Sequence, residues 1–203
     1  MAERGRPRAF DRAEALRQAM TVFWSRGYEG TSIGDLTEVM GINKPSLYAA
    51  FGCKEELFLE AVALYDAVEG NAGERALQEE PTARAAVEAM LRNNAEAYSA
   101  SDKPPGCMVV LSAILGTPEN RAVRERLAEN RRAGQEALRR RLDRGIAEGD
   151  VPPGTDTARL AAFYTTVLEG LSIQARDGAS GQALQAIADC ALQAWDVLVG
   201  PAS

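Results

Sequence analysis

The chain has 203 residues, of which 46% are hydrophobic, and a formal net charge of −6. This length suits one large domain or two small ones with a real core, and the longest apolar runs are too short to span a membrane. The N-terminal residues carry charges but not the apolar segment of a signal peptide, so we expect a cytoplasmic protein without a membrane partner.

The residue types available for chemistry are few. Histidine is absent, which removes the commonest metal ligand and the commonest general base. Cys53, Cys107 and Cys190 lie far apart without a CxxC pair, so neither a disulfide framework nor a thiolate metal site is indicated. We find no Gly-rich phosphate loop and no paired carboxylates in a plausible cleft sequence. We therefore expect no catalytic residue, no metal and no cofactor; a catalyst built on cysteine or lysine alone is left open.

The charge is distributed unevenly along the chain. Residues 1–54 hold 8 basic and 6 acidic side chains, whereas the remainder holds 15 basic and 23 acidic ones. Because an acidic body repels a phosphate backbone, such a chain would approach nucleic acid only with its N-terminal end. The overall charge is compatible with DNA binding.

The first ten residues are polar and contain Arg6 and Arg8 on either side of a proline. An extended basic arm of this kind suits insertion into a narrow minor groove, and an ordinary charged terminus is the alternative. A helix is predicted next, because Asp11 is a good N-cap and apolar residues follow it at helical spacing. Trp24 and Tyr28, near the end of this segment, are expected to pack in the core.

Residues 31–54, TSIGDLTEVMGINKPSLYAAFGCK, predict two short helices joined by a tight turn. Ser32 can accept a hydrogen bond from the backbone N–H of Asp35 while Asp35 reaches back, as in a capping box. Gly41 supplies a residue that can adopt φ > 0 at the helix end. One face of this first helix is apolar, formed by Ile33, Leu36 and Met40.

The second short helix has its own start signals. Asn43 is a good N-cap, and Pro45 lies in the first turn, where a missing N–H costs nothing. Leu47 and Phe51, four residues apart, point toward the apolar face of the first helix. The outer face then shows Lys44, Pro45, Ser46, Tyr48 and Ala49. This is the layout of a helix-turn-helix unit that offers its second helix to a major groove.

The joined motif resembles a known family. G-I-N-K-P-S-L-Y-A-A-F-G-x-K-E-E-L at residues 41–57, with D-R-A-E-A-L-R-Q-A-M-T-V-F-W-S-R-G-Y-E-G-T-S at residues 11–32, is similar to the DNA-binding signature of TetR (tetracycline repressor-like) bacterial transcriptional regulators. The resemblance implies a ligand-responsive regulator, most often a repressor, that binds a palindromic operator as a dimer and is released by a small-molecule effector. It also implies that the first helix supports the motif from behind and that Thr31 or Ser32 touches a phosphate.

The predicted DNA contacts come from the arm, the turn and the second helix. Lys44, Ser46 and Tyr48 can donate to phosphates, whereas Pro45 and Ala49 can make apolar contacts, for example with a thymine methyl group. Many relatives have a tyrosine or histidine where this chain has two adjacent alanines, so two polar contacts are absent here. The full predicted set is Arg6, Arg8, Thr31, Ser32, Asn43, Lys44, Pro45, Ser46, Tyr48, Ala49 and Lys54.

Beyond this motif the pattern predicts only helices. One begins at Lys54, with Gly70 and Gly73 expected to loosen it, and the resemblance implies that it moves when an effector binds. The apolar run at residues 107–115 could be a strand by composition, but the lack of other strand-like segments favours a buried helix. The remaining helices are predicted at residues 81–101, 118–148, 156–175 and 181–199, with Pro- and Gly-containing breaks between them.

The last two predicted helices combine apolar stripes with small residues that permit close helix approach. Two such helices per chain suggest a four-helix interface between two copies of the chain, and a hairpin packed within one chain is the alternative. A two-fold dimer would present two recognition helices about 34–36 Å apart to a palindromic operator.

A mainly apolar effector pocket is expected among the C-terminal helices. Its candidate lining is Met90, Tyr98, Cys107, Met108, Leu111, Phe163, Tyr164 and Val167, each of which could equally be a core residue. Cys107 opens an apolar helix, whose N-terminus can lower the pKa of a thiol. Two interpretations of Cys107 are open: a reactive thiol that senses oxidants or electrophiles, as in some TetR-like regulators, and a small buried residue.

We therefore predict an all-α protein in two parts. Residues 1–53 form a three-helix, helix-turn-helix DNA-binding domain with a basic arm, and residues 54–203 form a larger helical domain for ligand binding and dimerisation. The predicted partners are double-stranded operator DNA, a second copy of the chain and a small-molecule effector. A thiol-based sensor acting through Cys107 and a helical ligand-binding protein that does not bind DNA are the alternatives.

Overall fold

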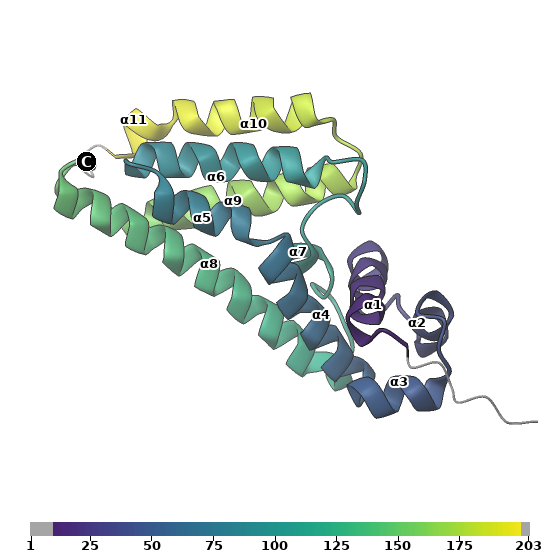
Figure 1. Ribbon diagram of the computed structural model, residues 1–203. Coiled ribbons are helices and arrows are strands. Elements are labelled where there is room, and N and C mark those ends of the chain that lie inside the picture. Colours follow the sequence, from purple (N-terminus) through teal and green to yellow (C-terminus); the bar gives the residue numbers. More distant parts are fainter. Residues whose placement is uncertain (1–9, 200–203) are drawn as a thin grey trace, which may run out of the picture.

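The computed structural model describes residues 10–199, apart from the side chains of Asn71 and Ala72. Over this range the chain is all-α, and no strand occurs in residues 10–199 (Figure 1), which confirms the predicted fold class. The helices are α1 (Arg12–Arg26), α2 (Ile33–Val39), α3 (Lys44–Phe51), α4 (Lys54–Val68), α5 (Asn71–Glu79), α6 (Ala83–Tyr98), α7 (Met108–Leu111), the 3-10 turn η1 (Pro118–Asn120), α8 (Arg121–Glu148), α9 (Thr157–Arg176), α10 (Gly181–Gln193) and α11 (Trp195–Leu198).

The first four helices form one unit, which we call the head. Phe23 of α1, Leu36 of α2, Leu47 of α3 and Phe58 of α4 are all fully buried in a shared hydrophobic core. The rings of Phe23 and Phe58 meet edge to face with their centroids 5.0 Å apart. The domain boundary predicted after residue 53 coincides with the start of α4, but the inner face of α4 completes the core that α1–α3 begin.

The remaining helices α5, α6 and α8–α11 form a larger unit, which we call the body. Figure 1 shows α6, α9 and α10 running side by side, with the long helix α8 extending from the far end of the body down to the head. Helix α8 contributes to both cores, since Leu138 and Leu142 are buried in the body while Val123 and Leu127 are buried with the head. This shared helix links the packing of the two units.

The apolar run around α7 forms a much shorter helix than predicted. The Ser112 carbonyl accepts a hydrogen bond of 2.7 Å from the backbone N–H of Tyr28, so the chain leaves the helix there. Gly27 permits this close approach: its φ is 73°, and a Cβ at this position would lie 3.1 Å from the Ser112 carbonyl oxygen. Ile114 and Leu115 are consequently exposed. The prediction of one buried helix across the whole run is wrong because a tertiary hydrogen bond ends it.

Two other predicted helices are divided. The helix that begins at Lys54 ends at Val68, and α5 starts just after Gly70, close to where the glycines were expected to loosen it. The last helix was predicted to continue unbroken to residue 199, but it is interrupted at Ala194. The Ala194 N–H bonds to the Ala191 carbonyl at 3.3 Å, which tightens the turn and redirects α11.

One charged side chain is buried in the body. The Arg141 side chain on α8 is 1% exposed, and it lies 3.8 Å from the Asp150 carboxylate and 3.9 Å from that of Glu148. Its guanidinium also donates to the Glu80 carbonyl at 3.2 Å. Asp150 in turn accepts a 2.8 Å hydrogen bond from the Ala83 N–H at the start of α6. This cluster joins the start of α6 to the end of α8.

Candidate nucleic-acid interface

The start of α2 has the capping box that its sequence predicts. The Ser32 Oγ accepts from the Asp35 N–H at 3.1 Å, and Asp35 Oδ2 accepts from the Ser32 N–H at 2.8 Å. Arg26 forms an ion pair with Asp35 at 2.7 Å. Hydrogen bonds from Ser32, with a smaller contribution from Arg26, hold the pKa of Asp35 below its usual value. The box leaves Ser32 exposed at the start of the helix, with its hydroxyl also donating to Asp35 Oδ2.

Helix α3 is oriented by its caps and by its apolar side. Asn43 Oδ1 accepts from the Ser46 N–H at 2.9 Å, which starts the helix. Leu47 and Phe51 are buried against the head core and fix which side faces inward. The opposite side presents a row of accessible residues, in which Tyr48 is 49% exposed. Lys44, Pro45 and Ala49 are exposed with it, and Ser46 is half-buried.

Thr31 lies in a different environment from its neighbour Ser32. Thr31 is only 1% exposed, and its hydroxyl donates to the Gly27 carbonyl at 2.7 Å. In this conformation the Thr31 hydroxyl fixes the turn between α1 and α2, so it is not available to a phosphate. Of the two residues that the resemblance implied, Ser32 is the exposed one, and its hydroxyl donates to the Asp35 carboxylate.

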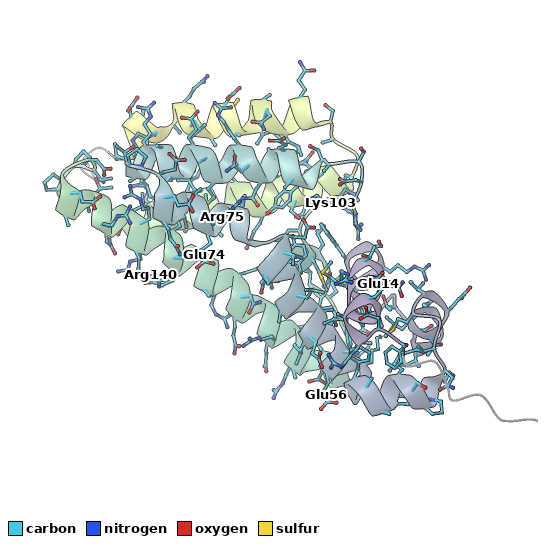
Figure 2. All side chains as sticks on the ribbon, in the orientation of Figure 1. Glu14, Glu56, Glu74, Arg75, Lys103 and Arg140 are labelled. Carbon is cyan, nitrogen blue, oxygen red and sulfur yellow. The ribbon has the colours of Figure 1, made fainter. Side chains whose placement is uncertain are left out.

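Lys54 begins α4, next to the end of α3. Its ammonium lies 4.2 Å from the centre of the Tyr28 ring, and its half-buried position lowers its pKa, which the nearby Glu29 carboxylate partly offsets. Cys53 and Glu56 cap this helix, since the Cys53 N–H donates to Glu56 at 2.8 Å. Figure 2 shows Glu56 at this corner, where α3 meets α4. The start of α4 thus places the Lys54 ammonium against the segment between α1 and α2.

These features match family models in both parts of the chain. A model of bacterial regulatory proteins of the tetR family matches residues 15–61, and a model of tetracyclin repressor-like C-terminal domains matches residues 83–190. The chain belongs to the TetR family. The family resemblance predicted from the sequence is confirmed, and the first match includes α2, α3 and the start of α4.

Individual relatives of this TetR-family chain agree over nearly its whole length. A solved structure of the TetR family regulator CifR, a cysteine mutant complexed with 26-base-pair operator DNA, is 49% identical, covers 94% of this chain and 100% of its own, and has a TM-score of 0.91. The transcriptional repressor ComR of Escherichia coli K12 is 34% identical over 97% of this chain and 94% of its own. The repressor BdcR of the same strain is 33% identical, with 94% and 91% covered.

The TetR-family head also contains a side chain that sequence reasoning missed. Arg12, in the first turn of α1, donates to both Glu60 carboxylate oxygens at 2.8 Å and, through Nε, to the Ala50 carbonyl at 3.2 Å. Its guanidinium lies 4.3 Å from the centre of the Phe51 ring. These contacts tie the last turn of α3 to α1 and α4. No sequence signal indicates them, because the partners are 38 and 48 residues away.

The head is also bonded directly to the body of this TetR-family protein. Trp24 Nε1 donates to the Gly106 carbonyl at 3.0 Å, which confirms its packing role. Arg176 of α9 donates to the carbonyls of Trp24 and Ser25 at 3.0 and 2.6 Å. The C-terminal part of the chain therefore contacts the end of α1 through the loop before α7 and through α9.

Six of the eight predicted effector-pocket residues belong to the body core or pack against it. Met90, Tyr98 and Tyr164 are buried in the body core, and Met108 is buried in the head core. Leu111, Phe163 and Val167 are half-buried. Cys107 contacts both cores. The structure brings Cys107 and Tyr98 together but does not gather the full set around one space.

The Cys107 thiol lies between two tyrosines, one from each unit. It interacts by hydrogen bonds with Tyr65 of α4 and Tyr98 of α6, and its backbone N–H donates to the Ser172 hydroxyl of α9 at 2.8 Å. Burial raises the pKa of the Cys107 thiol, although these hydrogen bonds act in the opposite direction. The sequence did not indicate Tyr65 or Ser172 as its neighbours.

Within the described part of the chain we looked for a metal site and for a membrane-spanning helix. Within residues 10–199, no group of three or more cysteine, aspartate or glutamate side chains is placed to hold a metal ion. Over the same range, no helix is long and apolar enough to cross a bilayer. Arg6 and Arg8, the predicted minor-groove arm, lie outside the described residues.

Proposed function

We propose that this chain is a cytoplasmic transcriptional repressor, not an enzyme, that binds a palindromic operator as a homodimer and is released by a small-molecule effector. The observation that carries the proposal is the exposed face of α3, held by buried Leu47 and Phe51 on a TetR-family head. CifR, whose chain matches this one with a TM-score of 0.91, is complexed with operator DNA in its solved structure.

In the proposed complex, α3 enters the major groove and the neighbouring helix starts bind the backbone. Lys44, Pro45, Ser46, Tyr48 and Ala49 face the bases and the flanking phosphates, and Asn43 caps the helix that carries them. In the same proposed complex, Ser32 at the start of α2 and Lys54 at the start of α4 contact phosphates. The acidic body stays away from the DNA.

The operator contact predicts a measurable effect at Tyr48. We expect the purified protein to shift DNA from upstream of its own gene, and to bind it more weakly as salt is raised, because phosphate contacts release counterions. Tyr48→Ala is expected to weaken binding about tenfold, roughly 1.4 kcal/mol. The exposed position of Tyr48 means that the melting temperature should stay unchanged.

A matched substitution makes this test specific. Val39→Ala, at an exposed residue in the same motif, should leave both operator affinity and melting temperature unchanged. Equal operator affinity of Tyr48→Ala and the unchanged protein would contradict the proposed role of α3. Absence of binding to this fragment and to a random operator library would favour a helical ligand-binding protein that does not bind DNA.

The proposed dimer uses an exposed apolar stripe on the last helices. Along α10 and α11 the stripe residues recur every three or four positions, and the neighbouring α9 adds Ile173, which is 43% exposed. Ile187 and Val197 in the stripe are 38% and 83% exposed. The stripe consists of Ala183, Ile187, Cys190, Ala194 and Val197. Burying these residues against a second copy would remove apolar surface from water and build the four-helix interface.

A charged substitution within the stripe should separate the copies. We expect Ile187→Asp to convert the dimer to monomers in sedimentation analysis, because a carboxylate would be buried without a partner. Ala133→Asp, on an exposed position of α8, serves as the control and should leave the dimer intact. Operator affinity should fall with dimer dissociation, because only a dimer engages both half-sites at once. A dimeric Ile187→Asp protein would place the interface elsewhere.

Cys107 supports a second candidate for how the repressor is released. Its thiol contacts Tyr65 of the head and Tyr98 of the body. An adduct on the sulfur would therefore disturb the packing between head and body at this point. Because burial covers the thiol and raises its pKa, we expect Cys107 to react with iodoacetamide at least tenfold more slowly than exposed Cys53, as followed by peptide mass spectrometry. Faster labelling of Cys107, accompanied by operator release, would instead establish the thiol sensor.

A further inference from the structure

A hollow of about 370 Å³ lies between the loop after α7 and the first three turns of α8. The residues of α8 that border it recur at helical spacing and share one side of the helix. This surface belongs neither to the exposed face of α3 nor to the stripe proposed for dimerisation. The walls are Ala113, Ile114, Arg121, Arg124, Glu125, Ala128 and Arg131.

The hollow has an excess of positive charge. Three arginines border it together with one carboxylate, that of Glu125, which lies 3.4 Å from Arg121. Arg124 and Arg131 have no ion pair among the described residues, although Arg131 donates to the Val109 carbonyl at 2.9 Å. The Nε of Arg124 is buried and has no hydrogen-bond partner within residues 10–199. With three guanidinium groups and one carboxylate at its border, this side of the hollow favours an anion.

The other wall is apolar and accessible. Ile114 is 50% exposed, and the adjacent Leu115 is 83% exposed. Ala113 borders the hollow from the same loop, and Ala128 adds an apolar residue from α8. The positive and apolar walls therefore face one space, which suits a molecule that has an anionic end and a short aliphatic part.

We propose that this hollow binds a small amphiphilic carboxylate. The planar guanidinium of Arg124 can hold a carboxylate in a bidentate manner, assisted by Arg131, while the aliphatic part covers Ile114. The Arg124 stem passes close to Gly116, where the lack of a side chain leaves room for it, since a Cβ there would lie 3.2 Å from the Arg124 Cδ.

An occupant of this hollow would act next to the head. Both ends of the loop are bonded to the segment between α1 and α2: the Tyr28 N–H donates to the Ser112 carbonyl at 2.7 Å, and Glu29 accepts from the Thr117 N–H at 3.1 Å. Glu29 also accepts from Asn120 at 2.7 Å. A ligand that moves this loop therefore changes the position of α2 and α3. This regulatory step rests on the proposed operator binding, whereas the site itself does not.

Calorimetric titration of the full chain tests the site without DNA. Hexanoate is the probe, and hexanol and inorganic phosphate serve as matched compounds that lack the charge or the aliphatic part. We expect hexanoate to bind at least tenfold more tightly than either. Equal binding of hexanol would show an apolar hollow only, equal binding of phosphate would show a bare anion site, and no binding of hexanoate would show an empty surface; each overturns the proposal.

Substitutions locate the binding and separate it from operator release. Arg124→Gln should weaken hexanoate binding at least tenfold, whereas Arg132→Gln, at an exposed position of the same helix, should leave it unchanged. If Arg124→Gln bound hexanoate as tightly as the unchanged protein, at an unchanged melting temperature, the proposed site would be overturned. Hexanoate should also change operator affinity in the unchanged protein but not in Arg124→Gln.

Ligand binding in the hollow and its effect on operator affinity can be disproved separately. Hexanoate binding without a change in operator affinity would support the site and overturn its regulatory role. A chain that binds hexanoate but no operator would support the site and refute the repressor function.

Discussion

Replacing Phe58 by alanine is expected to lower the free energy of unfolding by about 3–5 kcal/mol and to abolish operator binding at micromolar concentration. Phe58 is fully buried, and its ring packs against Phe23 and Tyr28 with centroid separations of 5.0 Å in both cases. The substitution removes these contacts and leaves a cavity where α4 completes the head core. Urea unfolding followed by circular dichroism, together with a mobility shift, measures both effects.

Two control substitutions test whether the loss of stability in Phe58→Ala comes from the cavity in the head core. Val68→Ala, at an exposed residue in the last turn of α4, should change stability by less than about 0.5 kcal/mol. Phe58→Leu keeps an apolar side chain in the same space. Its loss in free energy of unfolding should therefore lie between those of Val68→Ala and Phe58→Ala. If Phe58→Ala cost less than about 1 kcal/mol, then α1–α3 would form a stable domain without α4, and the boundary after residue 53 would describe an independent unit.

Replacing Asp150 by alanine should have the second largest effect, a loss of about 3–5 kcal/mol. Arg141 is almost completely enclosed, and its Nε and one terminal nitrogen have no hydrogen-bond partner within residues 10–199. Removing the Asp150 carboxylate leaves that charge with the carboxylate of Glu148 alone, which is 50% exposed. It also removes the acceptor for the Ala83 N–H at the start of α6. Thermal and urea unfolding measure the change.

Two companion variants divide this loss between charge and capping. Asp150→Asn removes the charge but keeps an oxygen that can accept from Ala83, so it should recover about 1 kcal/mol relative to Asp150→Ala. Combining Asp150→Asn with Arg141→Met removes both charges and should restore most of the remaining stability, because a buried ion pair is often replaceable by apolar side chains. A double variant no more stable than Asp150→Asn alone would show that the Arg141 charge is not the cause.

The local parts of the head were predictable because the responsible interactions lie within a few residues. The Ser32–Asp35 box and the Asn43 cap each join residues three apart, so their spacing in the sequence is sufficient to indicate them. The inward positions of Leu47 and Phe51 follow from helical periodicity in the same way. Together these signals define α2, the turn and α3, including which side of α3 is exposed.

The length and the surroundings of other segments could not be predicted by the same means. A helix across the run around α7 agrees with local propensity, but the hydrogen bond between Tyr28 and Ser112 ends it. Thr31 and Ser32 are both hydroxyl residues at a helix start, and only the fold buries one and exposes the other. From the sequence, Arg12 is expected to be an ordinary solvated surface residue. Only the fold brings the Ala50 carbonyl of α3 and Glu60 of α4 next to it.

By itself, the sequence determined an all-α chain, a helix-turn-helix with an exposed recognition face, and membership of the TetR family. These properties depend on periodicity, on short-range caps and on a contiguous motif, all of which a linear chain records directly. Only the tertiary structure decided that α4 completes the head core and that Cys107 lies between Tyr65 and Tyr98. Only it placed the unpaired Arg124 beside Ile114. The reason is that burial and charge pairing depend on distances between segments, which the order of residues does not specify.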